Sequence, residues 1–317
     1  MAALGGAGTT CRRGRAGRTR HSCRPSRGSG SVSALDPRIT PCNGKVAASH
    51  LKGQVEAEKF LDGELQQCSV AVADMLGKPD GRRVSQLVYG DLFNVLEETK
   101  GYLFGQAVND GYCGYIKADQ LGDPEDPSHW VAVPATHLYP GPHVRLMTTG
   151  TLYFGSEVSV VGVEGDWIRL AGGACVPSSH VLPLEERLDD PVTIADLMLG
   201  SPYLWGGITR YGIDCSGLVQ MAWRACGLEC PRDSDMQEAE LGRALPQGET
   251  PRRGDLVFWK GHVGLVAERN MLLHANAHHM AVAYEKLDAA IVRIAEAGGG
   301  PVTSIKRIDG LKLNRRP

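Results

Sequence analysis

The clearest hydrophobic pattern in the chain predicts a helix that begins at about Cys215. Apolar residues recur at helical spacing after Asp214 and stop before Gly227, a residue type that commonly follows a helix. These apolar positions are Leu218, Val219, Ala222, Trp223 and Cys226. The pattern therefore predicts a helix over about 215–226, with Cys215 in its first turn.

Short apolar runs on either side of this helix predict further elements. Downstream, residues 254–259 and 261–266 read as two strands joined by a tight turn, and residues 271–276 read as a third strand. Upstream, a helix is expected over 191–199, because Pro191 is suited to a first helical turn. Residues 191–276 are thus predicted to contain helices followed by a sheet.

The pattern before residue 190 is one of short alternating strands, and it contains a repeat. Residues 89–96 align with residues 154–161, and each stretch starts with an aromatic-glycine turn and continues as a strand. Short strands at close spacing, separated by turn residues, are typical of a small barrel. We therefore predict two small barrels, over 66–122 and 128–184, joined by a connector at 122–127 that is rich in acidic residues and proline.

The N-terminal residues have a different composition. Residues 1–34 are rich in Gly, Ser and Arg, and no acidic residue occurs before Asp36, so we expect a disordered basic extension. An upstream extension from a misplaced start codon is favoured over a transit peptide or a nucleic-acid-binding arm, and no secretory signal is indicated. Residues 35–65 read as a lead-in segment, in which loosely spaced apolar positions over 46–61 predict a short helix.

Composition and charge narrow the class of protein. The 317 residues, 42% hydrophobic and 22% charged, suit a soluble protein of two or three domains. A net charge of −2 gives no reason to expect nucleic acid or a membrane as a partner, and no apolar run approaches the ~18–20 residues of a membrane span. The nine cysteines are scattered without a CxxC pair, so we expect no zinc site, and a reducing compartment fits best.

Candidate chemistry lies where the predicted helix meets the predicted strands. A cysteine in the first turn of a helix lies near free backbone N–H groups and the positive end of the helix dipole, which both favour the thiolate. A histidine on a facing strand can withdraw the thiol proton, and a polar residue on the next strand can orient that histidine. Cys215, His262 and His274 occur in this order and predict a nucleophile, a base and an orienting group.

The stretches around these residues resemble a known family. DCSG, GDLVFW, GHVGLV and LLHANA are similar to the motifs of the NlpC/P60 cell-wall cysteine peptidases, and the resemblance covers 191–313. It implies a papain-like core and the catalytic roles already given to Cys215, His262 and His274. The two N-terminal units resemble bacterial SH3 (SH3b) domains. The expected fold is therefore α+β, with a papain-like NlpC/P60 catalytic domain preceded by two small SH3-like β-barrels.

The arrangement of units further resembles γ-D-glutamyl-L-diamino acid endopeptidases, also called dipeptidyl-peptidase VI. This resemblance implies a cytoplasmic, cofactor-free and metal-free monomeric cysteine peptidase of peptidoglycan recycling. Its expected partner is a murein tripeptide with an unblocked L-Ala, cut after γ-D-Glu. Whether meso-diaminopimelate or L-Lys follows the cut is left open.

The resemblance also implies which residues contact the substrate. A free ammonium needs an anion if it is to be buried, and a carboxylate needs hydrogen-bond donors. The expected ammonium contacts are Asp214, Tyr112 and Asp80. The expected carboxylate contacts are Ser216 and the loop Arg232-Asp233-Ser234-Asp235, in which Ser234 is favoured and Arg232 is less secure. Tyr203 would face the oxyanion, and Trp205 would form the cleft wall. Purely structural roles stay open, as a helix cap for Asp214, a turn residue for Asp80 and core packing for Tyr203 and Trp205.

Other functions fit parts of the same pattern. An exported hydrolase of intact peptidoglycan, anchored by its SH3b units, would tolerate an acylated L-Ala. A thiol acyltransferase on a papain-like core would transfer the acyl group to an amine rather than to water. A binding module with an inert peptidase domain is disfavoured, because Cys215, His262 and His274 are all present.

Overall fold

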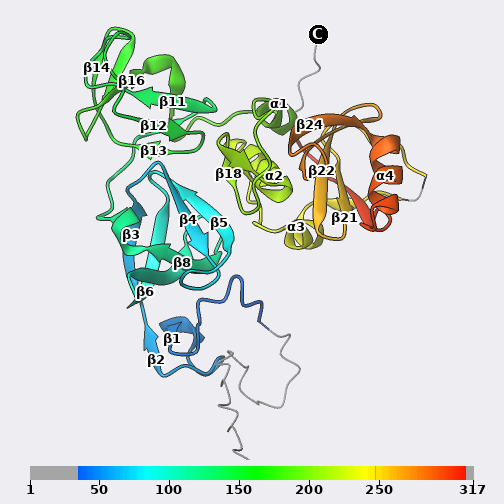
Figure 1. The fold of residues 1–317 in the computed structure, drawn as a ribbon, viewed down its shortest axis with the longest axis horizontal. Helices are drawn as coiled ribbons and strands as arrows, with labels where there is room; N and C mark the ends of the chain where they lie inside the picture. Colours follow the sequence, from blue (N-terminus) through cyan, green and yellow to red (C-terminus); the bar gives the residue numbers. More distant parts are fainter. Residues whose placement is uncertain (1–34, 247, 312–317) are drawn as a thin grey trace, which may run out of the picture.

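The computed structural model describes residues 35–246 and 248–311, which form three successive units after a short lead-in (Figure 1). The predicted extension 1–34 and the last two residues of the predicted catalytic domain lie outside the described residues. The first two units consist of strands and short 3-10 turns, and the third combines helices with a sheet. Figure 1 shows the three units arranged around helix α2 (Cys215–Ala225).

The lead-in segment packs on the first unit as strand and turn. Strand β1 (Val46–Ala48) pairs in parallel with β2 (Lys59–Leu61), with the 3-10 turn η1 (Ser49–Leu51) between them. Their apolar side chains pack against Leu96 and Phe104 of the first unit. The helix predicted over 46–61 is therefore wrong, because its loosely spaced apolar residues do not form one helical stripe and are buried from strands and a turn.

The first unit is a single antiparallel sheet with the strand order β5-β4-β8-β7-β6-β3-β9. Its core includes Met75, Phe93 and Ile116, all fully buried. Among the described residues no pairing of β5 with β9 closes the sheet, so the predicted barrel is not confirmed as a closed one. The elements are β3 (Glu64–Cys68), β4 (Val72–Leu76), β5 (Arg83–Val88), β6 (Leu92–Thr99), β7 (Tyr102–Ala107), β8 (Cys113–Lys117), η2 (Ala118–Gln120) and β9 (Leu121–Gly122).

The second unit consists of three small sheets, with the strand orders β13-β10-β17, β11-β12 and β14-β15-β16. They share one core, which includes Val131, Ile168 and Val176. This unit is not confirmed as a closed barrel either. The elements are β10 (His129–Val131), β11 (Ala135–Leu138), β12 (Gly150–Tyr153), β13 (Glu157–Val158), β14 (Val160–Glu164), β15 (Trp167–Leu170), β16 (Cys175–Pro177), η3 (Ser178–His180) and β17 (Val181–Pro183).

The two units touch at the turns that the sequence repeats. Gly90 and Gly155 both have a positive φ, of 94° and 84°, which glycine adopts without strain. The Glu157 N–H donates to the Tyr89 carbonyl at 2.9 Å. A Cβ at Gly90 would lie 2.4 Å from the Glu157 carbonyl oxygen, so this contact requires glycine.

The third unit places helices on both faces of the six-stranded sheet β20-β25-β21-β22-β23-β24. The helices predicted near 191 and 215 and the three predicted strands are present, with bounds shifted by a few residues. The elements are α1 (Pro191–Asp196), β18 (Ile208–Thr209), β19 (Gly212–Ile213), α3 (Ser234–Glu240), β20 (Arg243–Ala244), β21 (Leu256–Trp259), β22 (His262–Glu268), β23 (Met271–Asn276), β24 (Ala281–Lys286), α4 (Leu287–Glu296) and β25 (Ser304–Arg307).

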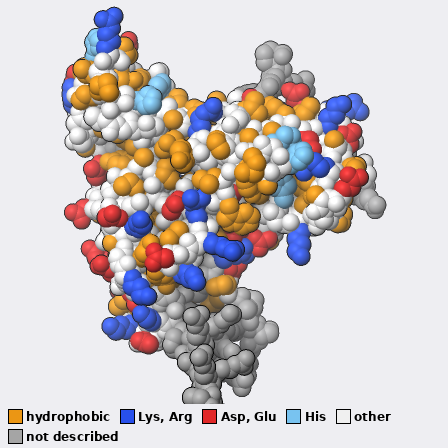
Figure 2. Space-filling model, in the orientation of Figure 1, with side chains coloured by type: hydrophobic (Ala, Val, Ile, Leu, Met, Phe, Trp, Pro, Cys, Tyr) orange, Lys and Arg blue, Asp and Glu red, His pale blue; other side chains and the backbone are white. Residues whose placement is uncertain are grey.

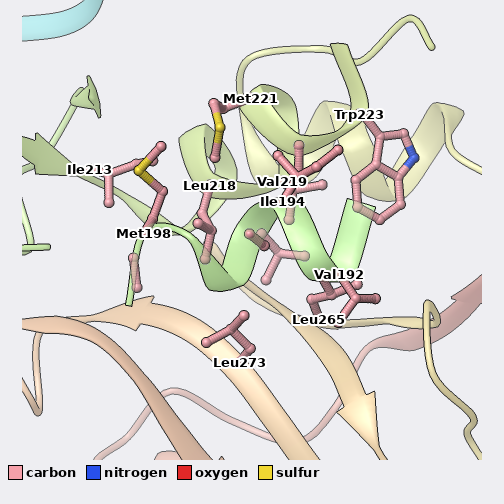
Figure 3. Packing of buried hydrophobic residues seen from close by; sticks show 14 of the residues in the cluster. Val192, Ile194, Met198, Ile213, Leu218, Val219, Met221, Trp223, Leu265 and Leu273 are labelled. Atoms are coloured by element: carbon pink, nitrogen blue, oxygen red, sulfur yellow. The ribbon is translucent and has the colours of Figure 1, made fainter. Parts of the chain in front are cut away.

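Alternating residues of the sheet face the two helical layers. Leu265 and Leu273 point toward α1 and α2, beneath Leu218 and Val219 (Figure 3). Their neighbours Val266 and Leu272 pack instead with Leu287 and Ala290 of α4 on the other face. A strand buried on both faces reads as a continuous apolar run, which is the pattern that predicted β21 to β23.

Polar contacts, some buried and some exposed, join the first and third units. The Ile208 N–H donates to Gln86 Oε1 at 3.1 Å, and Gln220 Nε2 of α2 donates to Asp110 Oδ2 at 2.9 Å. Arg83 Nη1 donates to the Trp205 carbonyl at 3.1 Å. These contacts fix the loop before α2 against the first sheet.

The surface carries both signs of charge. Figure 2 shows basic and acidic side chains interspersed over the visible face, in keeping with the net charge of −2. Among the described residues, every helix is too short or too polar to cross a bilayer.

Candidate active site

Helix α2 begins at Cys215 because Asp214 caps it. Asp214 has extended backbone angles, and its Oδ1 accepts from the Gly217 N–H at 2.7 Å, which satisfies one of the free donors at the helix start. The same carboxylate accepts from the Gly206 N–H at 2.8 Å and so ties the preceding loop to the cap. Cys215 thereby occupies the first helical position and is buried.

The thiol of Cys215 faces the start of strand β22. The backbone N–H groups of Val263 and Ser216 both donate hydrogen bonds to the sulfur. His262 is the residue before Val263 and follows Gly261, whose φ of 75° forms the tight turn. The helix start and the strand start therefore bring the predicted nucleophile next to the predicted base.

His262 leads into a line of side chains on three neighbouring strands. Its Nε2 lies 3.0 Å from Nδ1 of His274 on β23, and His274 Nε2 lies 3.1 Å from Glu285 Oε2 on β24. Arg293 of α4 donates to both oxygens of Glu285, at 2.8 and 2.7 Å. His274 has no exposed surface, so its two ring nitrogens are committed to these two contacts.

Burial keeps the candidate catalytic groups neutral. It lowers the pKa of His262 to about 4 and that of His274 to about 3, with the positive charge of Arg293 acting in the same direction. It raises the pKa of the Cys215 thiol to about 12, with the charge of Asp214 adding to the effect. Near neutral pH, the free protein therefore holds Cys215 as a thiol and both His262 and His274 as neutral imidazoles.

This state corrects the expectation that the helix start favours the thiolate. The N–H groups of Val263 and Ser216, together with Arg232, do lower the pKa of Cys215. Their effect is smaller than the cost of placing a charged sulfur in a buried site. Burial therefore raises the pKa of Cys215 overall, although the helix start acts in the opposite direction.

Asp214 and Ser216 share a buried arginine. Arg232, 1% exposed, donates to Asp214 Oδ1 and Oδ2 at 3.0 and 2.8 Å and to Ser216 Oγ at 2.9 Å. Its Nε donates to Ser85 Oγ of the first sheet at 3.0 Å. Asp214 therefore caps the helix, which was one of its two predicted roles. It also forms an ion pair with Arg232 that the sequence did not indicate. Ser234 is half-buried and opens α3.

A second polar cluster joins the first unit to the residue after Arg232. Tyr112 Oη donates to Asp233 Oδ2 at 2.9 Å, and Arg38 Nη1 of the lead-in donates to the same oxygen at 2.8 Å. Arg38 also donates to Asp235 at 2.8 Å and to Asp36 at 2.7 Å. Three carboxylates therefore hold the Arg38 guanidinium, and the phenol of Tyr112 donates to one of them. Arg38 is not among the predicted site residues, because no local sequence pattern marks it.

The remaining predicted site residues lie at the edges of the site. Burial and the nearby Cys215 raise the pKa of Tyr203, so its phenol keeps its proton and can donate. Trp205 is 66% exposed. Asp80 has a φ of 54° in the turn between β4 and β5, and it accepts from Tyr102 Oη at 2.9 Å. That contact supports its turn role, and a substrate contact for Asp80 stays a prediction.

Within the described residues, His274, His279 and Glu285 are placed so that their ligand atoms could meet around a metal ion. These atoms lie within 4.8 Å of one another. Glu285 is already held by two donors of Arg293, whose positive charge would repel a metal cation. The same contacts serve the hydrogen-bond line that leads to His262.

A cavity of about 300 Å³ lies elsewhere, where the three units meet. Its lining includes Val88 of the first unit, Phe154 of the second, and Met221 and Arg224 from the C-terminal half of α2. Cys215 and both histidines are outside this lining, so the cavity is distinct from the candidate catalytic groups.

Known families match two parts of the chain. The sequence profile of the NlpC/P60 family matches residues 200–294, which contain Cys215, His262 and His274. The profile of the bacterial dipeptidyl-peptidase Sh3 domain matches residues 76–121, which cover most of the first sheet.

Curated relatives carry peptidase names. The chain is 30% identical over 184 residues to a gamma-D-glutamyl-L-lysine dipeptidyl-peptidase of Bacillus subtilis, an alignment that covers 52% of this chain and 60% of that protein. A Bacillus cereus protein of the same name is 30% identical over 50% of this chain and 54% of its own length. The chain thus spans somewhat more than half the length of these two relatives. It is also 34% identical to dipeptidyl-peptidase 6 of Lysinibacillus sphaericus, over 68% of this chain and 89% of that protein.

A solved structure shares the fold. The crystal structure of an NlpC/P60 family protein from Bacillus cereus superposes with a TM-score of 0.65, at 17% identity, over 77% of this chain and 99% of that chain. Since the family profile covers the candidate catalytic residues and the Lysinibacillus relative aligns over most of its length, this chain belongs to the NlpC/P60 family of cysteine peptidases.

Proposed function

We propose that the protein is a cysteine peptidase that hydrolyses the γ-D-glutamyl–diamino acid bond of free murein peptides with an unblocked N-terminal L-Ala. Cys215 is the nucleophile, His262 is the base, and His274 orients His262. The names of the Bacillus and Lysinibacillus relatives support this class of substrate.

The observation that carries the substrate assignment is the cation cluster around Asp233. Asp233 accepts from Tyr112 and from the Arg38 guanidinium, and it adjoins Arg232, whose side chain contacts the two neighbours of Cys215. A carboxylate that already binds one cation, next to a phenol oxygen with free lone pairs, offers what a substrate ammonium needs. The cluster would therefore hold the L-Ala amine while the γ-glutamyl carbonyl lies at the sulfur.

The first half of the reaction forms an acyl-enzyme. His262 Nδ1 takes the proton of the Cys215 thiol as the sulfur bonds to the γ-carbonyl carbon. The oxyanion accepts from the Cys215 N–H and from the phenol of Tyr203. When the C–N bond breaks, His262 gives its proton to the departing amine of the diamino acid, and a thioester with the dipeptide remains.

The second half releases the dipeptide. A water gives one proton to His262 Nδ1 while its oxygen bonds to the thioester carbonyl. The C–S bond then breaks, the sulfur regains the proton from His262, and L-Ala-D-Glu leaves as a carboxylic acid. The low pKa of His262, about 4, means that the imidazole is available as a base in both halves near neutral pH.

Arg38 competes with the substrate in this proposal. Its guanidinium occupies Asp233 Oδ2, the oxygen that the substrate ammonium would approach. Arg38 is about one-third exposed and retains Asp36 and Asp235 as partners, so it can release Asp233 without losing every counter-charge. Substrate binding is thus an exchange of one cation for another at Asp233.

The free amine also bears on where the enzyme acts. In intact peptidoglycan the L-Ala nitrogen is acylated by the muramyl lactyl group, so a free ammonium exists only on released peptides. We therefore infer a cytoplasmic enzyme of peptide recycling, which cell fractionation with an antibody to the protein would test.

The test compares three substrates by mass spectrometry. L-Ala-γ-D-Glu-meso-diaminopimelate, its N-acetyl derivative and polymeric peptidoglycan are incubated with the wild-type protein and with Cys215→Ala. We expect L-Ala-D-Glu from the free tripeptide only, and none from the variant. Acetylation removes the charge that the cluster pairs with and should lower kcat/KM by on the order of 10⁴-fold.

Other outcomes decide against the proposal. Equal cleavage of the acetylated peptide or of the polymer would favour a hydrolase of intact wall. Transfer of the dipeptide to an added amine, with little hydrolysis, would favour an acyltransferase. Replacing diaminopimelate by L-Lys in the tripeptide identifies the leaving residue.

A further inference from the structure

The hydrogen-bond line from His262 does not end at His274. Glu285 on β24 accepts at His274 Nε2, 3.1 Å away, and Arg293 holds both of its oxygens from α4. Neither profile nor spacing marked Glu285 as part of the site. His279 does not interrupt the line, since its N–H and ring nitrogen both contact Asn276 Oδ1.

The protonation states of Glu285, His274 and His262 allow one arrangement of the ring protons along this line of hydrogen bonds. Arg293 lowers the pKa of Glu285, so the carboxylate carries no proton and must accept one from His274 Nε2. His274 is neutral, with a pKa of about 3, and therefore has no second proton on Nδ1. Nδ1 must accept from His262 Nε2. His262 is neutral as well, so its own Nδ1 is bare.

We propose that Glu285 is a positioning residue that sets the tautomers of both histidines, so that the bare nitrogen of His262 faces Cys215. The proposal rests on the proposed peptidase site and deepens it. His274 alone cannot make this choice, because a neutral imidazole presents one donor and one acceptor in either order. The Glu285 carboxylate can only accept a hydrogen bond, so it stabilises the tautomer of His274 that carries its proton on Nε2.

Because Arg293 fixes the orientation of the side chain at position 285, one substitution there can invert the tautomers of both histidines. In Glu285→Gln the two donors of Arg293 bind the amide oxygen, which turns the amide NH₂ toward His274. His274 Nε2 must then accept, its Nδ1 carries the proton, and His262 accepts at Nε2. The proton of His262 moves to Nδ1, where it blocks transfer from the thiol.

The experiment uses the full chain and three readouts. Glu285→Gln is compared with wild type and with Glu268→Gln, a matched change at the exposed end of β22. The readouts are hydrolysis of the free tripeptide, the rate at which iodoacetamide alkylates Cys215, followed by mass spectrometry of its peptide, and ¹⁵N NMR of the histidine rings. Alkylation and NMR need no substrate, so they decide this inference even when the tripeptide is not cleaved.

We expect Glu285→Gln to lower kcat on the order of 10³- to 10⁴-fold with little change in KM, because an inverted tautomer removes the base but not the binding contacts. We expect Cys215 alkylation to slow in parallel, and we expect the NMR spectra of the variant to show the His262 proton on Nδ1 instead of Nε2. Glu268→Gln changes none of the three. A wild-type protein with its His262 proton on Nδ1 overturns the proposal, whether or not the variant folds. So does a folded Glu285→Gln with wild-type alkylation.

Discussion

The buried pair of Arg232 and Asp214 offers a sharp test of what holds the start of α2 in place. Arg232→Met keeps most of the side-chain length but removes the charge and every donor. Asp214 would keep its contacts with the N–H groups of Gly206 and Gly217 yet lose its ion pair with Arg232. Breaking one side of a buried pair typically costs about 3–5 kcal/mol, because the other charge stays buried.

The assay is equilibrium urea denaturation of the full chain, with a double-mutant cycle. Asn caps helices about as well as Asp, so Asp214→Asn retains the cap but leaves Arg232 unpaired, and it should cost a similar amount. The double variant should lose less than the sum of the two single variants, by about 0.5–3 kcal/mol. The exposed pair of Arg243 and Asp309 supplies the control, since Arg243→Met should cost about 1 kcal/mol or less.

Two results would refute this reasoning. The first is a loss of less than about 1 kcal/mol in the unfolding free energy of Arg232→Met, which is the range of a surface pair. The second is additivity of the two single losses in the double variant, which would mean that Arg232 and Asp214 act on stability separately. In either case the cap alone would explain the position of Cys215.

Three further predictions concern activity. Arg38→Ala frees Asp233 and should lower the KM for the tripeptide about 2- to 5-fold at unchanged kcat in steady-state kinetics, whereas a raised KM would make Arg38 a substrate contact. Tyr112→Phe removes one hydrogen bond to Asp233 and should lower kcat/KM by about 2- to 10-fold, with no loss on the acetylated peptide; an equal loss on both peptides would remove Tyr112 from ammonium binding. The acid limb of kcat/KM should lie below pH 6.5, toward pH 4, because a lowered pKa keeps His262 neutral as the pH falls; a limb above pH 6.5 in a pH-rate profile would contradict the buried state of that ring.

The catalytic region was predictable because its signals are local. Cys215 follows a capping aspartate and starts an apolar helical pattern, while His262 and His274 sit in apolar runs of strand length. Helical layers on both faces of the sheet then follow from the two-sided burial of β21 to β23. The raised pKa of Cys215 could not be predicted, because burial is a property of the packed site, which no helical pattern reports.

Residues that act through long-range contacts could not be predicted. Arg38 reaches Asp233 across 195 positions, and Arg232 reaches Ser85 across 147. Glu285 lies in a strand whose sequence marks no site residue, and it reaches His274 only because β24 pairs with β23. Closed barrels were expected from turn spacing, but spacing does not reveal whether the first and last strands of a sheet meet.

The buried polar contacts between the first sheet and the third unit have a consequence for dissecting the protein. Ser85 and Gln86 supply acceptors to Arg232 and to the Ile208 N–H, both close to the loop that precedes Cys215. Cutting the chain near residue 190 would expose these donors and loosen the very loop that presents the sulfur. A fragment that begins near residue 190 would therefore lack part of the structure that positions Cys215. Its activity and stability should not be equated with those of the chain that retains the first sheet.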